Sequence, residues 1–198
     1  MGLAYSTISP LGNRILHMLS YITLLEYNDV TDPQVKNVYD EIRAELGFGI
    51  VPNLFKSMAS HPGFLAAQWQ KFRAVILHGE VPRTLKEMIG VVISQANGSE
   101  YALRVHLHSL SALGISEDIL QLLVQDFESC PLPQHQKEAI RFSLAAATQP
   151  RSVAEADYAR LREIGLSSAE IMELVATANL FASVNQYTDS IMLEIDTL

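Results

Sequence analysis

Cysteine is almost absent from this 198-residue chain, which contains Cys130 and no other. A single cysteine cannot form an intrachain disulfide, so no disulfide framework supports the fold. Cys130 lies in a segment with the pattern of a loop between helices, at residues 127–131. We interpret its thiol as structural or incidental.

Basic charge and long hydrophobic runs are also lacking. The chain has 14 Lys and Arg against 22 Asp and Glu, a net charge of −8. No basic patch typical of a nucleic-acid binder is visible, and an anionic membrane surface is not an expected partner. No run approaches the roughly 18 apolar residues of a spanning helix, and no basic region opens a secretory signal. We therefore predict no nucleic-acid or membrane partner and a cytoplasmic location.

Apolar residues, in contrast, make up 48% of the chain, and charged residues only 18%. A chain of this length buries roughly 70% of its unfolded surface, which is enough for one sizeable core. The apolar surplus indicates either a large core or a helical surface covered by another subunit. The surplus thus supports an oligomer, with a large core as the alternative.

Helical periodicity runs through most of the sequence, and no convincing strand pattern appears. We predict an all-α, single-domain fold of about eight to ten helices. Residues 1–21 have the pattern of an N-terminal arm and residues 22–198 that of the helical domain, with a short helix at residues 15–25. The other predicted helices cover about residues 33–46, 52–60, 63–78, 83–96, 99–113, 116–125, 134–147, 152–163 and 167–193.

Several helix ends carry specific signals. Asp32 before Pro33 suits an N-cap followed by proline at the first helical position. Asn97-Gly98 is a strong C-terminal signal. Ser167 and Glu170 have the spacing of a capping box, in which serine and glutamate satisfy each other's backbone N–H groups.

The residues with catalytic potential lie on either side of the turn at Gly98. In the helix after it, His106 falls on the apolar face, whereas His108 falls on a more polar face and is expected to point to solvent. The preceding helix is apolar almost all round after Glu87, which indicates burial. Glu87 and His106 are at comparable distances from the turn, so they could face each other across a helical hairpin as an acid–base pair.

A purely structural interpretation of both residues stays open. An inward-facing histidine is more often a hydrogen-bonded core residue than a catalytic one. A glutamate in the first turn of a helix is common because it suits the helix dipole. A nucleophilic Ser99 would need His106 within hydrogen-bond reach, but the two are about 10 Å apart along one helix.

The spacing resembles the core motif of the alkylhydroperoxidase D (AhpD)-like and carboxymuconolactone decarboxylase superfamily, peroxidase-related branch. That motif is a glutamate, eleven residues, Cys-x-x-Cys, three residues and a histidine. This chain has Glu87, eleven residues, Ser99, Ala102 and then His106 at the same spacing. Flanking matches extend the resemblance over about residues 22–195, at residues 51–55, 61–62, 96–98 and 181–189.

By this resemblance the two redox cysteines of the family align with Ser99 and Ala102. Serine and alanine cannot run a thiol–disulfide cycle, and Cys130 lies outside the motif. Both are also the usual engineered replacements for cysteine, so an engineered double substitution is the alternative to natural divergence. Tyr101, Ala102 and His61 are the pocket candidates. We predict no metal site and no cofactor. Superfamily members assemble as dimers, trimers or hexamers, so the resemblance implies a homo-oligomer.

Three functions follow as alternatives. The first is a thiol-inactive protein that binds a small apolar or carboxylic ligand, or serves in assembly. The second is a non-redox acid–base enzyme of carboxymuconolactone decarboxylase type. It would use His106 as acid or base, Glu87 to orient it and Ser99 as a hydrogen-bond donor. The third is the peroxidase or peroxiredoxin-like activity typical of the family, which the missing cysteine pair argues against.

Overall fold

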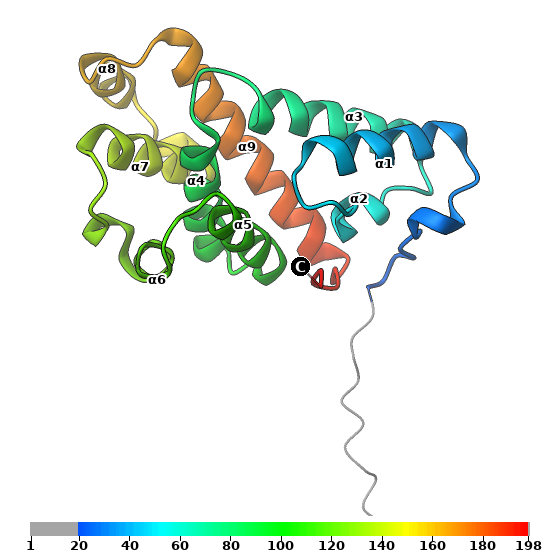
Figure 1. Cartoon of the computed structure of the whole chain (residues 1–198). Helices are drawn as coiled ribbons and strands as arrows, with labels where there is room; N and C mark the ends of the chain where they lie inside the picture. The colour runs from blue at the N-terminus through cyan, green and yellow to red at the C-terminus, as the bar shows by residue number, and fades with distance from the viewer. Residues whose placement is uncertain (1–19, 198) are drawn as a thin grey trace, which may run out of the picture.

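The computed structural model describes residues 20–197, and this part of the chain is all-α and forms a single domain (Figure 1). No strand occurs among these residues, as the sequence predicts. The α-helices are α1 (Pro33–Glu45), α2 (Asn53–Lys56), α3 (Pro62–Phe72), α4 (Arg83–Asn97), α5 (Glu100–Ala112), α6 (Glu117–Asp126), α7 (Gln134–Thr148), α8 (Glu155–Glu163) and α9 (Ser168–Ser190). The number of helices lies within the predicted range.

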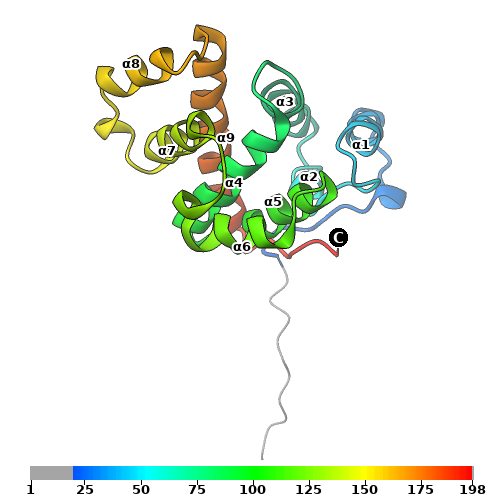
Figure 2. The same cartoon turned by 60° about the vertical axis from the view of Figure 1, so that its left-hand side comes forward.

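Helix α4 forms the centre of the domain. It packs against α5, α7 and α9, and its residues from Leu85 to Ser94 are all buried. Helices α1 and α3 pack together on one side of α9, and α7 and α8 lie on the other (Figures 1 and 2). The prediction of a buried helix after Glu87 is therefore confirmed.

The predicted helix-end signals form as expected. The Asp32 side chain accepts hydrogen bonds from the backbone N–H groups of Gln34 and Val35 at the start of α1. Gly98 ends α4 in the left-handed region, with φ of 69°, where a side chain would be strained. At the start of α9, the Ser167 hydroxyl accepts from the Glu170 N–H and the Glu170 carboxylate accepts from the Ser167 N–H. These ends are set by local chemistry.

Several predicted boundaries are wrong. The helix expected over residues 52–60 ends at Lys56, and the helix expected over residues 152–163 begins at Glu155. Residues 20–25 are not helical, because Tyr21 and Leu25 donate their backbone N–H groups to the carbonyls of Ile191 and Lys56. The last helix ends at Ser190, and not at residue 193, because Met192 adopts φ of 48°. A residue in the left-handed region is usually glycine, so a methionine at this position does not indicate a turn.

The predictions about the N-terminal arm and about membrane-spanning helices can be compared with the structure only for residues 20–197. Residues 1–19 lie outside the described part of the chain, and with them most of the predicted arm and of the predicted helix at residues 15–25. Between residues 20 and 197, no helix is both long and apolar enough to cross a bilayer.

Candidate functional site

A small cavity lies where α4, α5 and α9 meet the turn between α1 and α2. Its volume is about 40 Å³, and apolar and aromatic side chains form most of its wall. Three polar side chains interrupt that wall, from Glu87, His106 and Ser109. The other lining residues are Leu46, Phe48, Pro52, Phe55, Phe72, Tyr101, Ala102, Val105, Phe181 and Val184.

Glu87 and His106 form a direct pair at this cavity. The Glu87 Oε2 and His106 Nδ1 atoms are 2.7 Å apart, and the two residues are only 3% and 5% exposed. The chain reverses direction at Gly98, so α4 and α5 pack side by side. This packing brings Glu87 and His106 together across the hairpin. The predicted juxtaposition of Glu87 and His106 is what the structure shows.

Two further groups at Glu87 were missed by the sequence analysis. The Arg83 Nε atom lies 3.3 Å from Glu87 Oε1, and Arg83 Nη2 lies 3.5 Å from the Ser109 hydroxyl. Arginine and glutamate four residues apart share a helix face, so the spacing could have indicated this ion pair. Ser109 gave no comparable signal, because its position depends on how α5 packs on α4.

The charge state of Glu87 follows from these neighbours. Burial alone would raise the pKa of the Glu87 carboxyl. The hydrogen bond and charge of His106, the charge of Arg83 and the Ser109 hydroxyl outweigh burial, so the pKa lies below its usual value. Glu87 is therefore an ionised hydrogen-bond acceptor at neutral pH, which favours a proton on His106 Nδ1.

A glycine in α4 makes room for the imidazole ring. A Cβ atom added at Gly90 would lie 2.6 Å from His106 ring atoms, closer than real Cβ contacts allow. On its other side the ring packs edge-on against Phe181, with centroids 4.4 Å apart. Gly90 is the third residue the sequence analysis missed, although a glycine inside an apolar helix is often a sign of close packing.

The serine and tyrosine of the motif point away from the imidazole. Ser99 precedes α5 and donates its hydroxyl hydrogen to Asp189 Oδ1 at 2.7 Å, with no hydrogen bond to His106. This agrees with the expectation that Ser99 and His106 do not form a dyad. Tyr101 lines the cavity with its ring, while its hydroxyl donates to Asp196 Oδ2 at 2.7 Å. Ala102 also lines the cavity, as proposed for a pocket residue.

The structure places two other histidines differently from the predictions. His61 is exposed and does not line the cavity, because its Nδ1 atom accepts from the Phe64 N–H and caps α3. His108 is half-buried and packs edge-on against Phe48, with ring centroids 5.2 Å apart, so its ring is only partly open to solvent. Its helix face meets the turn before α2, a contact that helical periodicity cannot reveal.

The single thiol lies away from this site. Cys130 is buried at the junction before α7 and does not line the cavity. Burial raises the pKa of its thiol and so disfavours the reactive thiolate. Between residues 20 and 197, no group of three or more His, Cys, Asp or Glu side chains is placed to hold a metal ion.

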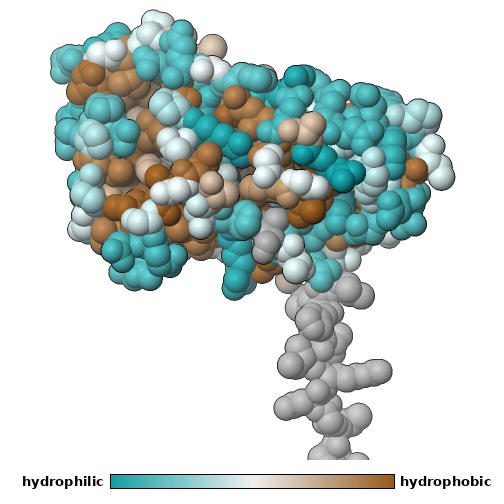
Figure 3. Space-filling view, viewed as in Figure 1, coloured by the Kyte–Doolittle hydropathy of each residue, from teal (hydrophilic) through white to brown (hydrophobic). Residues whose placement is uncertain are grey.

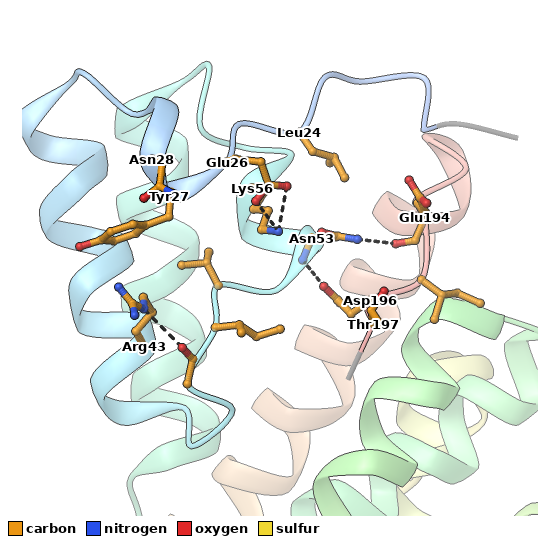
Figure 4. Close-up of a pocket in the computed structure, with 14 residues that line it drawn as sticks. Leu24, Glu26, Tyr27, Asn28, Arg43, Asn53, Lys56, Glu194, Asp196 and Thr197 are labelled. Carbon is orange, nitrogen blue, oxygen red and sulfur yellow. Dashed lines mark hydrogen bonds and ion pairs between the residues drawn. The ribbon is translucent and has the colours of Figure 1, made fainter. Parts of the chain in front are cut away.

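A larger, open hollow of about 730 Å³ lies between residues 24–28, the start of α2 and the C-terminal segment (Figure 4). Its polar groups already bind one another. Lys56 pairs with Glu26, and Asn53 donates to the Glu194 carbonyl and the Asp196 carboxylate. Neither Glu87 nor His106 lines it. The hollow is therefore a junction between chain segments, and the smaller cavity is the candidate site.

Residues 64–129, which include Glu87 and His106, match the model of the Carboxymuconolactone decarboxylase family. This segment is similar to that family, in agreement with the superfamily that the motif spacing resembles. It is also the segment that carries the Glu87–His106 pair. No curated protein sequence matches the chain.

Solved structures share the fold over nearly the whole chain. An AhpD-core, peroxidase-related protein from Ralstonia eutropha JMP134 is 22% identical, with a TM-score of 0.81 over 91% of this chain and 94% of its own. A peroxidase-related protein from Silicibacter sp. TM1040 is 20% identical, with a TM-score of 0.82 over 94% and 96%. A cysteine-to-alanine variant of the debrominase Bmp8, in complex with 2,3,4-tribromopyrrole, is also 20% identical, with a TM-score of 0.77 over 91% and 94%. At these identities the likeness establishes the fold.

Proposed function

We propose that this chain carries out acid–base chemistry on a small, largely apolar molecule. In this proposal His106 transfers the proton. Glu87 orients the His106 ring and stabilises its charged form. The observation that carries the proposal is the buried Glu87–His106 pair, at 2.7 Å, in the wall of an apolar cavity.

The energetics of burial support a functional role for the pair. Placing two ionisable groups away from water costs several kcal/mol per ion, and well-packed apolar residues often stabilise a fold equally well. A core without a function would therefore gain little from Glu87 and His106. Proton transfer, in contrast, needs a histidine held in one tautomer by a carboxylate.

The geometry also leaves one imidazole nitrogen available. Nδ1 of His106 faces Glu87, and within residues 20–197 the Nε2 atom has no hydrogen-bond partner. An ionised Glu87 keeps the proton on Nδ1, which leaves the lone pair on Nε2 free to accept a proton from a bound molecule. The imidazolium that results is stabilised by the Glu87 charge.

The chemistry of the first turn of α5 supports a reaction without a thiol. Ser99 and Ala102, aligned with the family's cysteines by the motif spacing, supply no thiolate, and Cys130 does not line the cavity. The Bmp8 variant binds a brominated pyrrole within the same fold. Together with the aromatic walls of this cavity, that favours a small ring as the ligand class for this chain.

The test combines a chemical and a binding measurement. A β,γ-unsaturated five-membered lactone is incubated with the protein in D₂O, and NMR follows deuterium entering the carbon next to the carbonyl. The base removes a proton from that carbon, and a deuteron from solvent replaces it. We expect His106→Asn to abolish the protein-dependent exchange and Glu87→Gln to lower it by roughly 10²-fold or more, in the range of general acid–base effects. The exposed His135 on α7 supplies the matched control, His135→Asn, which should exchange like the wild type.

Binding is measured separately through Trp69, the only tryptophan in the chain, which packs on the cavity residues Phe55 and Phe72. Bromine quenches a nearby tryptophan, so 2,3,4-tribromopyrrole should lower its fluorescence. Saturable quenching without any His106-dependent exchange would overturn the acid–base proposal and favour a ligand-binding role. If neither quenching nor deuterium exchange is seen, the proposal of a small ring as ligand fails as well.

A further inference from the structure

We infer that Phe48 sets the size of molecule that reaches the Glu87–His106 pair, because it closes the cavity as the movable part of its wall. This inference rests on the proposed function of that pair. It concerns the turn at residues 46–50, between α1 and α2, which we call the Phe48 turn.

The starting point is a mismatch of size. The cavity of about 40 Å³ holds a few water molecules at most, whereas a cavity that takes up benzene is on the order of 150 Å³. A ring-sized ligand can therefore enter only if part of the wall moves. Most of the wall belongs to buried residues of packed helices, for example Phe55 and Phe181 at 1% exposure, which do not move independently.

The Phe48 turn differs from the rest of the wall. Phe48 is half-buried and is flanked by Gly47 and Gly49, whose φ angles are 94° and 70°. A Cβ atom added at either glycine would meet nothing within 4 Å, so the backbone of the turn stands clear of its surroundings. A short turn with two glycines in open surroundings can change its dihedral angles at low cost.

Two arginines and one histidine hold the turn closed. Arg83 donates from Nη2 to the Leu46 carbonyl at 3.0 Å, and Arg43 donates from Nε to the Gly49 carbonyl at 3.3 Å. The Phe48 ring rests edge-on against His108. The two hydrogen bonds lie toward the ends of the turn and the ring contact lies at its centre. The turn can therefore open without breaking hydrogen bonds within the helices.

Arg83 also connects the turn to the pair. The same guanidinium that binds the Leu46 carbonyl lies 3.3 Å from Glu87 Oε1 and 3.5 Å from the Ser109 hydroxyl. Arg83 is therefore a positioning residue, which holds the base of the Phe48 turn and the Glu87 carboxylate in one geometry. A ligand that displaces Phe48 strains the contact between Arg83 and Leu46.

The experiment measures entry rates for bromopyrroles of increasing size by stopped-flow quenching of Trp69 in the full chain. Probes with one, two and three bromines are compared. We expect the wild-type association rate to fall with each added bromine. Phe48→Ala should raise the rate for 2,3,4-tribromopyrrole by about tenfold or more, because the open state no longer has to be populated first. The dependence on size should then largely disappear.

Two further variants make the test specific. Phe64→Ala removes another partly exposed phenylalanine, which does not line the cavity, and should keep the wild-type rates. Arg83→Gln should raise the association rate in the wild-type background but add nothing to Phe48→Ala. If Phe48→Ala does not fold, Phe48→Leu gives an intermediate rate under the same inference.

The outcomes separate this inference from the proposed function. Equal size dependence in the wild type and in Phe48→Ala would overturn the role of Phe48. If His106-dependent lactone exchange persists in that case, the proposed function still stands. If exchange is absent while Phe48→Ala speeds the entry of bromopyrroles, the gate is real and the acid–base proposal fails.

Discussion

At the scale of single residues, the site depends on how a buried carboxylate is compensated. Glu87 is surrounded by His106, Arg83 and Ser109, and together they lower its pKa although burial acts in the opposite direction. The motif spacing predicted the pair of Glu87 and His106. It did not predict the groups that keep Glu87 ionised. Arg83 lies one turn before Glu87 on α4 and is not part of the motif, and the position of Ser109 depends on how α5 packs on α4.

The lowered pKa of Glu87 gives a pH-dependent stability. A carboxyl group with a depressed folded-state pKa stabilises the fold above its ordinary pKa and loses that contribution as pH falls through the folded-state value. We expect the difference in unfolding free energy between the wild type and Glu87→Gln to shrink as pH falls below 4.5, the ordinary value. Urea denaturation at a series of pH values measures this difference. A difference in unfolding free energy that stays constant from pH 7 to pH 3 would contradict the lowered pKa of Glu87.

Gly90 offers a second residue-scale prediction. Gly90→Ala places a Cβ 2.6 Å from the His106 ring. We expect a loss of about 1–3 kcal/mol in unfolding free energy, the usual cost of overpacking, together with loss of lactone exchange. Gly63→Ala in α3 is the control, because its nearest neighbour would lie at 3.8 Å and an alanine there should be neutral or stabilising. Equal effects of the two substitutions would show that the His106 ring is not fixed by Gly90.

At the scale of helices, most boundaries follow from local chemistry that the sequence displays. Asp32, Gly98 and the Ser167–Glu170 box each act within one turn of their own helix, so they need no tertiary information. The π-helical segment Arg73–Leu77, which continues α3, was not anticipated. Its wider turn has no signature in apolar periodicity, so the sequence predicted one continuous helix there.

The capping box at the start of α9 allows a test of whether local side-chain hydrogen bonds stabilise a helix end. Ser167→Ala removes the acceptor for the Glu170 N–H and a hydrogen bond to Glu80. We expect a loss of about 1 kcal/mol in unfolding free energy, typical of an N-cap. Ser168→Ala, one residue along and exposed, should change the stability by much less. Equal losses for the two serines would mean that the box does not stabilise α9.

At the scale of the whole molecule, hydrogen bonds join segments that are far apart in the sequence. The Tyr101 hydroxyl donates to Asp196 and accepts from the Leu54 N–H at 3.0 Å, so it ties α5 to the C-terminal segment and to α2. Burial is the main cause of a raised pKa for both the Tyr101 phenol and the Asp196 carboxyl. Tyr101 thus both lines the cavity and fixes the segments around it.

Tyr101→Phe removes this tie while keeping the ring. We expect a loss of about 1–3 kcal/mol in unfolding free energy, because the Leu54 N–H and the Asp196 carboxylate lose a buried partner. Chemical denaturation measures the loss, and faster hydrogen exchange of the Leu54 amide would locate it. Tyr158→Phe is the control, since the Tyr158 hydroxyl has no hydrogen-bond partner within residues 20–197 and its ring packs on Phe142. Unchanged stability in Tyr101→Phe would contradict the tie.

The homo-oligomer stays a prediction at this scale. Hydrophobic residues are spread over the face shown in Figure 3, and the large hydrophobic side chains that remain exposed include Met172 and Val175, one turn apart on α9. We expect light scattering to give a mass above the 21.9 kDa of one chain and Met172→Glu to lower it. A mass of one chain for the wild type would overturn the expectation.

The sequence by itself determined the all-α class, the helix ends that carry a cap or a glycine signal, and the meeting of Glu87 with His106. These depend on periodicity, caps and the length of one hairpin, which are local properties of the chain. Only the tertiary structure decided how Gly90 makes room for the imidazole, how Ser109 contributes to the charge of Glu87, and how Phe48 closes the cavity. Those features depend on contacts between different helices and turns, and no local pattern encodes where these elements touch.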